Sequence, residues 1–193
     1  CYELTRKVYK LLGLNIDNIA EKFDAFDLLK IKDKKNKIDY NKIKQLLGQN
    51  KKFSEITLRE TTIQNENNMI EFDAIVGNPP YQEITAKKET DNGQKRTKSI
   101  FHYFQEVSDS LGRYVSLIYP GGRWIHRSGK GMAEFGLKQI NDPHLERVIF
   151  YSNADDLFDV VGIADGISIV VKNKNKSSKQ FVYEFIDNGV HQQ

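Results

Sequence analysis

At the centre of the sequence stands the segment Phe72-Asp73-Ala74-Ile75-Val76-Gly77-Asn78-Pro79-Pro80-Tyr81. Residues 72–76 form an apolar run, which predicts a buried β-strand. The strand continues through Gly77 into Asn-Pro-Pro-Tyr, where two prolines exclude further strand or helix. The sequence therefore predicts a buried strand that ends in a stiff loop.

The loop carries two hydrogen-bond acceptors on neighbouring residues, the Asn78 side-chain oxygen and the Pro79 carbonyl. An aromatic NH2 group is a poor nucleophile because its lone pair is delocalised into the ring, and two acceptors aimed at its N–H bonds push the nitrogen towards sp3. Proline fixes φ and so holds the second carbonyl still, while Tyr81 offers a face on which a planar group can stack. A proline-rich turn is the structural alternative, but the preceding strand and glycine favour a catalytic loop.

The composition is that of one globular domain: 193 residues, of which 39% are hydrophobic and 28% charged. No apolar run approaches the ~20 residues of a membrane span, and no targeting segment is visible. Cys1 is the only cysteine, and the four scattered histidines supply no zinc ligand set. We therefore expect a cytoplasmic protein with no membrane partner and no metal. A net charge of +3 permits an anionic partner without demanding one.

The first third of the chain alternates helical spacing with a lysine-rich region. Residues 2–12 are predicted to form a helix, and residues 24–29 a short strand that carries Asp27 to a loop. Residues 30–70 are interpreted as a lysine-rich insertion and linking region, with an amphipathic helix that ends at Gly48. A solvated insertion is favoured there over a contact with DNA phosphates.

Strand and helix patterns alternate after the central segment. Residues 82–98 are polar and predict a long mobile loop, residues 100–111 a helix, and residues 113–119 a buried strand that ends at Pro120-Gly121-Gly122. Strand-helix-strand repetition predicts parallel pairing, with the functional site at the carboxyl ends of the strands.

A basic segment follows this second strand. Between Ser110 and Ala133 the sequence has no carboxylate. A basic loop with an aromatic residue suits a nucleic-acid backbone, although an exposed loop without a partner is the alternative. The predicted nucleic-acid-binding residues are Arg123, Trp124, Arg127 and Lys130.

Consecutive strands are predicted at the end of the chain, over residues 145–151, over 160–171 in two segments, and over 181–186. Residues 172–193 are interpreted as the edge strand and the end of the domain. The expected fold is therefore α/β, with a mostly parallel sheet and an antiparallel edge hairpin.

The order of these features resembles the adenine-specific DNA methyltransferases of restriction-modification systems, in particular the group that combines restriction and methylation. Asn78 to Tyr81 match that family's Asn-Pro-Pro-Tyr motif, and residues 158–171 its late hairpin of the form Phe-x-x-Val-x-Ile-x-x-Gly-Ile. The resemblance implies a Rossmann-like methyltransferase sheet and S-adenosyl-L-methionine as cofactor. It assigns catalysis to Asn78, Pro79, Pro80 and Tyr81.

The resemblance also implies a mechanism on double-stranded DNA with a flipped adenine. Tyr81 stacks on the base, Asn78 and Pro79 accept its amino protons, and N6 attacks the sulfonium methyl in line. Cofactor contacts fall to Phe26, Asp27 and Gly77.

Two parts of the family pattern are missing from residues 1–193, the glycine-rich cofactor loop and the target-recognition region. We therefore expect a partial catalytic domain that lacks the N-terminal part of the fold and is inactive alone. Its expected partner is the remainder of the same polypeptide, including a nuclease domain if one is attached.

Three other functions fit the same residues: methylation of adenine in RNA, methylation of a glutamine amide in protein, or non-catalytic binding of nucleic acid. The basic residues around Arg123 favour nucleic acid, and the late hairpin favours DNA.

Overall fold

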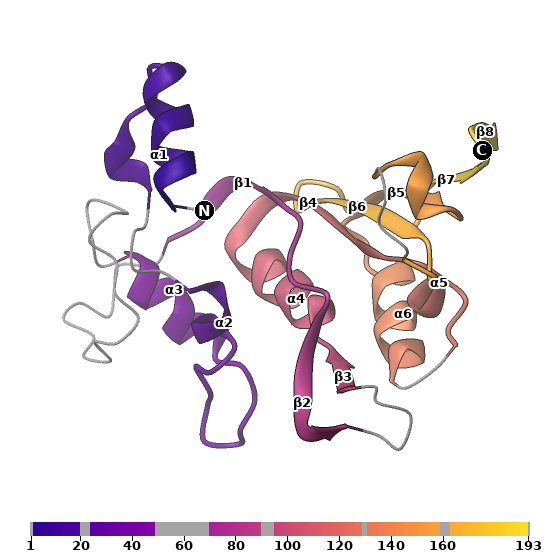
Figure 1. Ribbon diagram of the computed structural model, residues 1–193, viewed down its shortest axis with the longest axis horizontal. Coiled ribbons are helices and arrows are strands. Elements are labelled where there is room, and N and C mark those ends of the chain that lie inside the picture. The colour runs from indigo at the N-terminus through magenta and orange to yellow at the C-terminus, as the bar shows by residue number, and fades with distance from the viewer. Residues whose placement is uncertain are drawn as a thin grey trace. The chain divides into compact units, whose positions relative to one another are not determined.

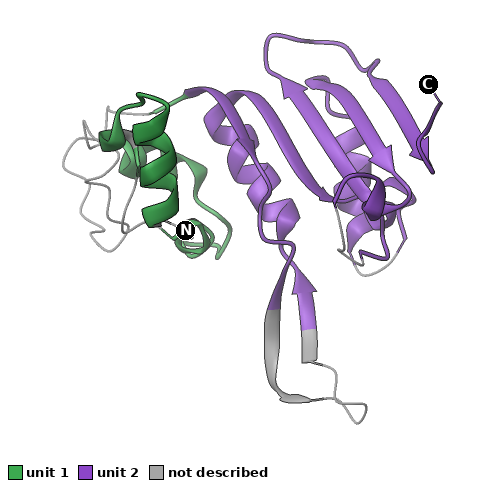
Figure 2. Ribbon diagram, turned by 45° about the horizontal axis from the view of Figure 1, so that its top comes forward, with its two compact units in different colours: residues 1–71 green, residues 72–193 purple. Residues whose placement is uncertain are grey.

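The computed structural model describes residues 2–19, 24–48, 70–89, 95–128, 131–158 and 163–192. Two compact units divide the chain, residues 1–71 and residues 72–193 (Figure 2). The predicted catalytic segment, residues 72–81, begins the second unit.

Four short helices make up the described part of the first unit: α1 (Tyr2–Leu11), the 3-10 helix η1 (Ile16–Asn18), α2 (Ala25–Leu28) and α3 (Tyr40–Gly48). The predicted helices over residues 2–12 and up to Gly48 are confirmed. In α3, apolar residues at helical spacing turn one face inwards, so that Ile43, Leu46 and Leu47 are buried. Residues 49–69 of the predicted linking region lie outside the described residues.

The strand predicted over residues 24–29 is wrong, because this segment forms the helix α2. Asp24 caps that helix: its Oδ1 accepts a hydrogen bond from the Phe26 backbone N–H at 3.0 Å. An aspartate in this position satisfies a backbone donor that a helix leaves free at its start, and so favours the helical turn.

The second unit is built on a six-stranded sheet: β1 (Phe72–Gly77), β4 (Gly112–Pro120), β6 (Ile167–Asn173), β5 (Leu145–Tyr151), β7 (Val182–Asp187) and β8 (Val190–Gln192), in that spatial order. The pairs β1/β4 and β5/β7 are parallel, whereas β6 is antiparallel to both β4 and β5. Four strands therefore run in one direction. The hairpin β7–β8 is antiparallel and lies at the sheet's edge (Figure 1). This confirms the predicted α/β class.

Helices α4 (Phe101–Leu111), α5 (Gly122–Ile125) and α6 (Met132–Ile140) enclose the core of this unit. Alternate residues of β4 point into it, because side chains alternate along a strand. The Phe101 ring of α4 stacks on Tyr119 of β4, with ring centroids 4.8 Å apart. Other buried members are Val115, Leu117, Trp124, Met132, Phe135, Leu145, Val148 and Val170.

β1 is less buried than the sequence predicts. Ile75 packs against the core, whereas Val76, whose side chain lies on the opposite face of the sheet, is 77% exposed. An apolar run predicts a strand covered on both faces. Here only one face is covered, so the expectation of a fully buried strand is wrong.

The long loop predicted over residues 82–98 is wrong for the described residues 82–89 and 95–98, while residues 90–94 lie outside the described residues. The described residues contain β2 (Gln82–Glu89) and β3 (Lys95–Ser99), which pair antiparallel with Gln82 opposite Ser99 and Glu83 opposite Lys98. The polar composition that predicted a loop does not prevent pairing, because the hydrogen bonds of a strand pair are made by the backbone.

Of the two strand segments predicted within residues 160–171, the second is confirmed as β6. The described strand there is β6 alone, which begins at Ile167 after a turn at Gly166. Residues 159–162 lie outside the described residues.

Candidate functional site

Three loops of the second unit lie at the same end of its sheet. The segment 78–81 follows β1, the segment from Gly121 follows β4, and the turn before β6 returns to this end because β6 is antiparallel. Two backbone hydrogen bonds join the last two loops, Gly121 N–H to Gly166 O at 3.3 Å and Gly122 N–H to Asp165 O at 2.7 Å. A side chain at Gly122 would place its Cβ 2.7 Å from that Asp165 oxygen, so glycine is required for this approach. The carboxyl ends of the strands thus carry the predicted catalytic motif.

The motif combines an exposed amide with an anchored aromatic ring. Asn78 is exposed, Pro79 and Pro80 are half-buried, and Tyr81 packs against the core. The Tyr81 carbonyl accepts a hydrogen bond from the Ile100 N–H at 3.0 Å, which fixes the loop to the start of α4.

Asn78 and Tyr81 also contact each other. Burial raises the pKa of the Tyr81 hydroxyl above its usual value, while a side-chain hydrogen bond from Asn78 works in the opposite direction. The Asn78 amide therefore lies beside the Tyr81 hydroxyl, at the exposed surface of the loop.

Packing does not require a glycine at position 77. A Cβ at this position would meet only Leu117 Cδ2, at 3.8 Å, which is an ordinary contact. Glycine in a strand without a packing reason is often found where a ligand or another backbone approaches closely.

Phe26 and Asp27 belong to the first unit, in α2, whereas Asn78 and Gly77 belong to the second. The Asp27 carboxylate accepts a hydrogen bond from Lys30 Nζ at 2.6 Å, and its side chain is 35% exposed. Asp27 therefore lies in a partly open turn, where it pairs with a lysine.

The predicted nucleic-acid-binding residues have different environments. Arg123 is half exposed, with its Nε 2.9 Å from Asp165 Oδ2. Arg127 is exposed and has φ +54°, in the left-handed region. Lys130 lies outside the described residues.

The prediction that Trp124 contacts nucleic acid is wrong, because its side chain is 1% exposed and belongs to the core. Its Nε1 donates to Ser168 Oγ at 3.2 Å, and that hydroxyl donates to Tyr119 O at 2.9 Å. No face of the indole is open to a base, so the ring anchors α5 instead of binding nucleic acid. The tendency of large aromatic residues to be buried is the signal that favours this arrangement.

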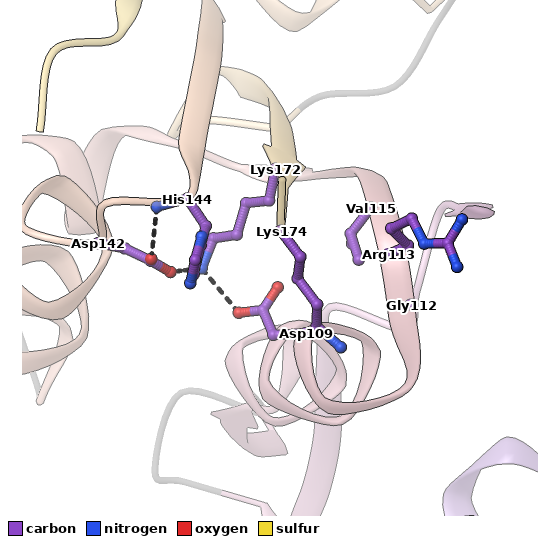
Figure 3. Close-up of a pocket in the computed structure, with 8 residues that line it drawn as sticks. All are labelled: Asp109, Gly112, Arg113, Val115, Asp142, His144, Lys172 and Lys174. Atoms are coloured by element: carbon purple, nitrogen blue, oxygen red, sulfur yellow. Dashed lines mark hydrogen bonds and ion pairs between the residues drawn. The ribbon is translucent and has the colours of Figure 1, made fainter. Parts of the chain in front are cut away.

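A cavity of about 240 Å³ lies at the opposite end of the sheet, where β4 begins (Figure 3). Within it, Lys172 is buried, and its Nζ bonds Asp109 Oδ2 at 2.7 Å and Asp142 Oδ2 at 2.8 Å. The residues that line the cavity are Asp109, Gly112, Arg113, Val115, Asp142, His144, Lys172 and Lys174. The sequence pattern did not single out this cluster, because its members come from segments far apart in the chain.

The two carboxyl groups at Lys172 have pKa values shifted in opposite directions. Burial raises the pKa of Asp109 above its usual value, and the Lys172 ammonium only partly offsets that effect. Burial also acts to raise the pKa of Asp142, but hydrogen bonds from Lys172 and from the His144 backbone lower it overall.

In the part of the chain that the structure describes, no group of three or more His, Cys, Asp or Glu side chains could hold a metal ion. Among the described helices, none is long and apolar enough to cross a membrane.

Comparison with known proteins places these features in context. The family model described as Eco57I restriction-modification methylase matches residues 9–158. No curated protein matches the chain.

Solved structures of type I restriction-modification proteins are similar over part of the chain. One, from a study of complex assembly and conformational transition of the type I system, has 13% identity and a TM-score of 0.40, and covers 61% of this chain and 24% of that chain. The methyltransferase subunit from Streptococcus thermophilus has 13% identity and a TM-score of 0.43, covering 68% and 28%. The EcoKI M protein has 15% identity and a TM-score of 0.40, covering 62% and 26%. The chain thus spans about a quarter of the length of these structures.

Proposed function

Because this chain belongs to the Eco57I restriction-modification methylase family, we propose that it carries the catalytic loop of a methyltransferase that modifies adenine N6 in duplex DNA, with S-adenosyl-L-methionine as methyl donor. One observation carries the proposal: β1 is followed directly by Asn78-Pro79-Pro80-Tyr81, in which an exposed amide precedes a ring that packs against the core. The activity, substrate and partners of the whole protein belong to this proposal.

The loop prepares an adenine amine for attack. The Asn78 side-chain oxygen and the Pro79 carbonyl accept hydrogen bonds from the two N–H groups of N6. These bonds localise the lone pair on the nitrogen. Pro80 stiffens the chain directly after the second acceptor. As N6 takes up a methyl group, it gives up one of the two protons that these acceptors hold, and that proton passes to solvent. Positioning and electrostatic stabilisation supply the rate.

The residues proposed to hold the cofactor have suitable chemistry. S-adenosyl-L-methionine, when bound, supplies a methyl group on a positively charged sulfur. The Asp27 carboxylate is a partly exposed acceptor for an adenine amine, and Phe26 offers aromatic surface. Gly77 leaves room at the strand end, since a side chain there would meet only Leu117.

A methyl-transfer assay on the full-length protein tests the proposed function. With cofactor labelled in the methyl group, we expect label in N6-methyladenine of duplex DNA, and none in RNA or in protein glutamine. Label in RNA or in protein glutamine would show that this molecule, and not DNA, is the substrate. DNA binding without transfer to any substrate would leave a binding module as the function.

Tyr81→Ala should lower methylation substantially, whereas Tyr81→Phe should keep most of it. Stacking of a base on an aromatic ring contributes about 1–3 kcal/mol, which corresponds to roughly 5- to 150-fold. Phe retains the ring and loses only the hydroxyl that bonds Asn78. Single-turnover methylation by both variants gives the comparison. Equal damage by Phe and Ala would show that the hydroxyl, and not the ring, is what matters.

A further inference from the structure

An ion pair between Arg123 and Asp165 lies at the end of the sheet that carries the catalytic motif. Arg123 belongs to α5, which directly follows β4, and Asp165 belongs to the turn before β6. β4 is the parallel neighbour of β1, the strand that leads into Asn78. The arginine therefore follows the strand next to the one that ends in the proposed catalytic loop.

The ion pair uses only one edge of the guanidinium. Arg123 Nε lies 2.9 Å from Asp165 Oδ2, so this contact leaves both Nη groups for another partner. Among the described residues, no hydrogen bond or ion pair engages those Nη groups. The Arg123 side chain is 51% exposed. Its outer donors are thus open to a ligand, while its inner donor is fixed.

Asp165 is itself held in place. Its carbonyl accepts a hydrogen bond from the Gly122 N–H at 2.7 Å, and Gly122 is the residue before Arg123. The next carbonyl, that of Gly166, accepts from the Gly121 N–H at 3.3 Å. The Asp165 side chain is only 29% exposed. The carboxylate therefore starts from a fixed backbone, and it can hold the long arginine side chain in one direction before a ligand binds.

The charge around the pair favours an anionic ligand. The chain has no carboxylate between Ser110 and Ala133, so Asp165 supplies one to a segment that has none of its own. Arg127, one turn after Arg123, is exposed and has φ +54°. Residues other than glycine that are held in the left-handed region concentrate at functional sites. An ion pair at the surface contributes little to stability, so stability alone does not explain the pair.

We propose that Asp165 is a positioning residue, which aims the Arg123 guanidinium at a phosphate of the duplex DNA beside the target adenine. The proposal rests on the proposed function and deepens it. The sequence predicts a nucleic-acid contact for Arg123, whereas Asp165 becomes its partner only through the fold. Two Nη groups in one plane match two phosphate oxygens. Such contacts fix the register of a protein on DNA, and here they hold the duplex at the loop that receives the flipped base.

The salt dependence of DNA binding by the full-length protein tests the phosphate contact. Arg123→Gln removes the contact, so the slope of log affinity against log salt should become less steep by about 0.9. The advantage of the wild type in affinity should then shrink by about 3.5-fold between about 50 and 200 mM salt. Because the catalytic loop is intact, KM for DNA should rise while kcat stays near the wild-type value.

The sign of the effect at position 165 tests the positioning role. Asp165→Ala removes a negative charge, which by itself would strengthen the binding of DNA phosphates. If the carboxylate aims Arg123, this variant should instead bind DNA more weakly and lose most of the slope that Arg123→Gln loses. Asp165→Asn keeps one acceptor oxygen at the same place, and should restore binding. In a protein that already carries Arg123→Gln, Asp165→Ala should weaken binding no further.

A second arginine–aspartate pair provides matched controls. Arg113 Nη1 lies 3.1 Å from Asp73 Oδ1, where β1 and β4 begin, at the opposite end of the sheet. Arg113→Gln and Asp73→Ala make the same changes of charge as the test variants. Both should leave the slope and KM for DNA unchanged.

The other outcomes each contradict one proposal. Tighter binding by Asp165→Ala would show that Asp165 is only an opposing charge, and would overturn its positioning role. An unchanged slope for Arg123→Gln, in a wild-type protein that methylates DNA, would overturn the phosphate contact. A raised KM for S-adenosyl-L-methionine with unchanged DNA binding would assign Arg123 to the cofactor carboxylate, and would also overturn it. A wild-type protein that neither binds nor methylates duplex DNA would instead remove the proposed function.

Discussion

Asn78→Ala should lower the rate of methyl transfer roughly 100- to 1000-fold, while DNA affinity hardly changes. The expected size of this effect is taken by analogy from oxyanion holes. There, the loss of one preorganised polar partner costs about 2.7–4 kcal/mol. Asn78 is comparable because it directly precedes two prolines, which stiffen the loop that carries its amide. Phosphate contacts made elsewhere carry most of the affinity for DNA.

Single-turnover methylation and a binding isotherm on the same variant separate chemistry from binding. Asn78→Asp keeps one acceptor oxygen, and should therefore retain more activity than Ala. Gln82→Ala, which removes an exposed amide four residues further on, is the matched control and should behave like wild type. If Asn78→Ala methylates at the wild-type rate, the loop is only a stiff turn and the catalytic assignment fails.

The elements that hydrophobic periodicity predicts correctly are those that depend on local sequence. The helix over residues 100–111, the strand up to Pro120 and the strand over 145–151 each show the pattern that their burial requires. The loop at Asn78 follows from proline chemistry, which is also local. These features fix the end of the sheet at which the candidate site lies.

The features that the sequence did not reveal depend on contacts between distant segments. Trp124 looked like a surface aromatic among cations, but its partner Ser168 lies 44 residues away. The strands β2 and β3 looked like a loop, because their pairing, with Glu83 opposite Lys98, leaves no periodic apolar signal in the sequence. Lys172 ends an apolar strand, and nothing near it in sequence indicates that two carboxylates from other elements surround it.

Lys172→Met should destabilise the second unit by about 3–5 kcal/mol, because removal of one partner leaves buried charge without compensation. The Lys172 side chain is 6% exposed, and the carboxylates of Asp109 and Asp142 are 26% and 22% exposed. Both carboxylates would lose the ammonium group that holds them together. Equilibrium unfolding by urea at neutral pH measures the change.

The effect should diminish on acidification. Lys172 lowers the pKa of both Asp109 and Asp142, so its loss raises both folded-state values. A carboxyl group whose folded pKa lies above its unfolded value stabilises the fold below the unfolded pKa, and this stabilisation is lost as pH rises through the folded value. The difference between variant and wild type should therefore be largest at neutral pH and decrease as pH falls towards about 4.

Two further variants separate charge from packing at this site. Lys179→Met changes an exposed lysine in the connection between β6 and β7, and should stay within about 0.5 kcal/mol of wild type. Asp109→Asn and Asp142→Asn added to Lys172→Met remove the uncompensated charges, so the triple variant should be more stable than the single one at neutral pH. A Lys172→Met protein with unchanged stability, or one whose deficit does not depend on pH, would mean that the aliphatic part of Lys172, and not its charge, holds these elements together.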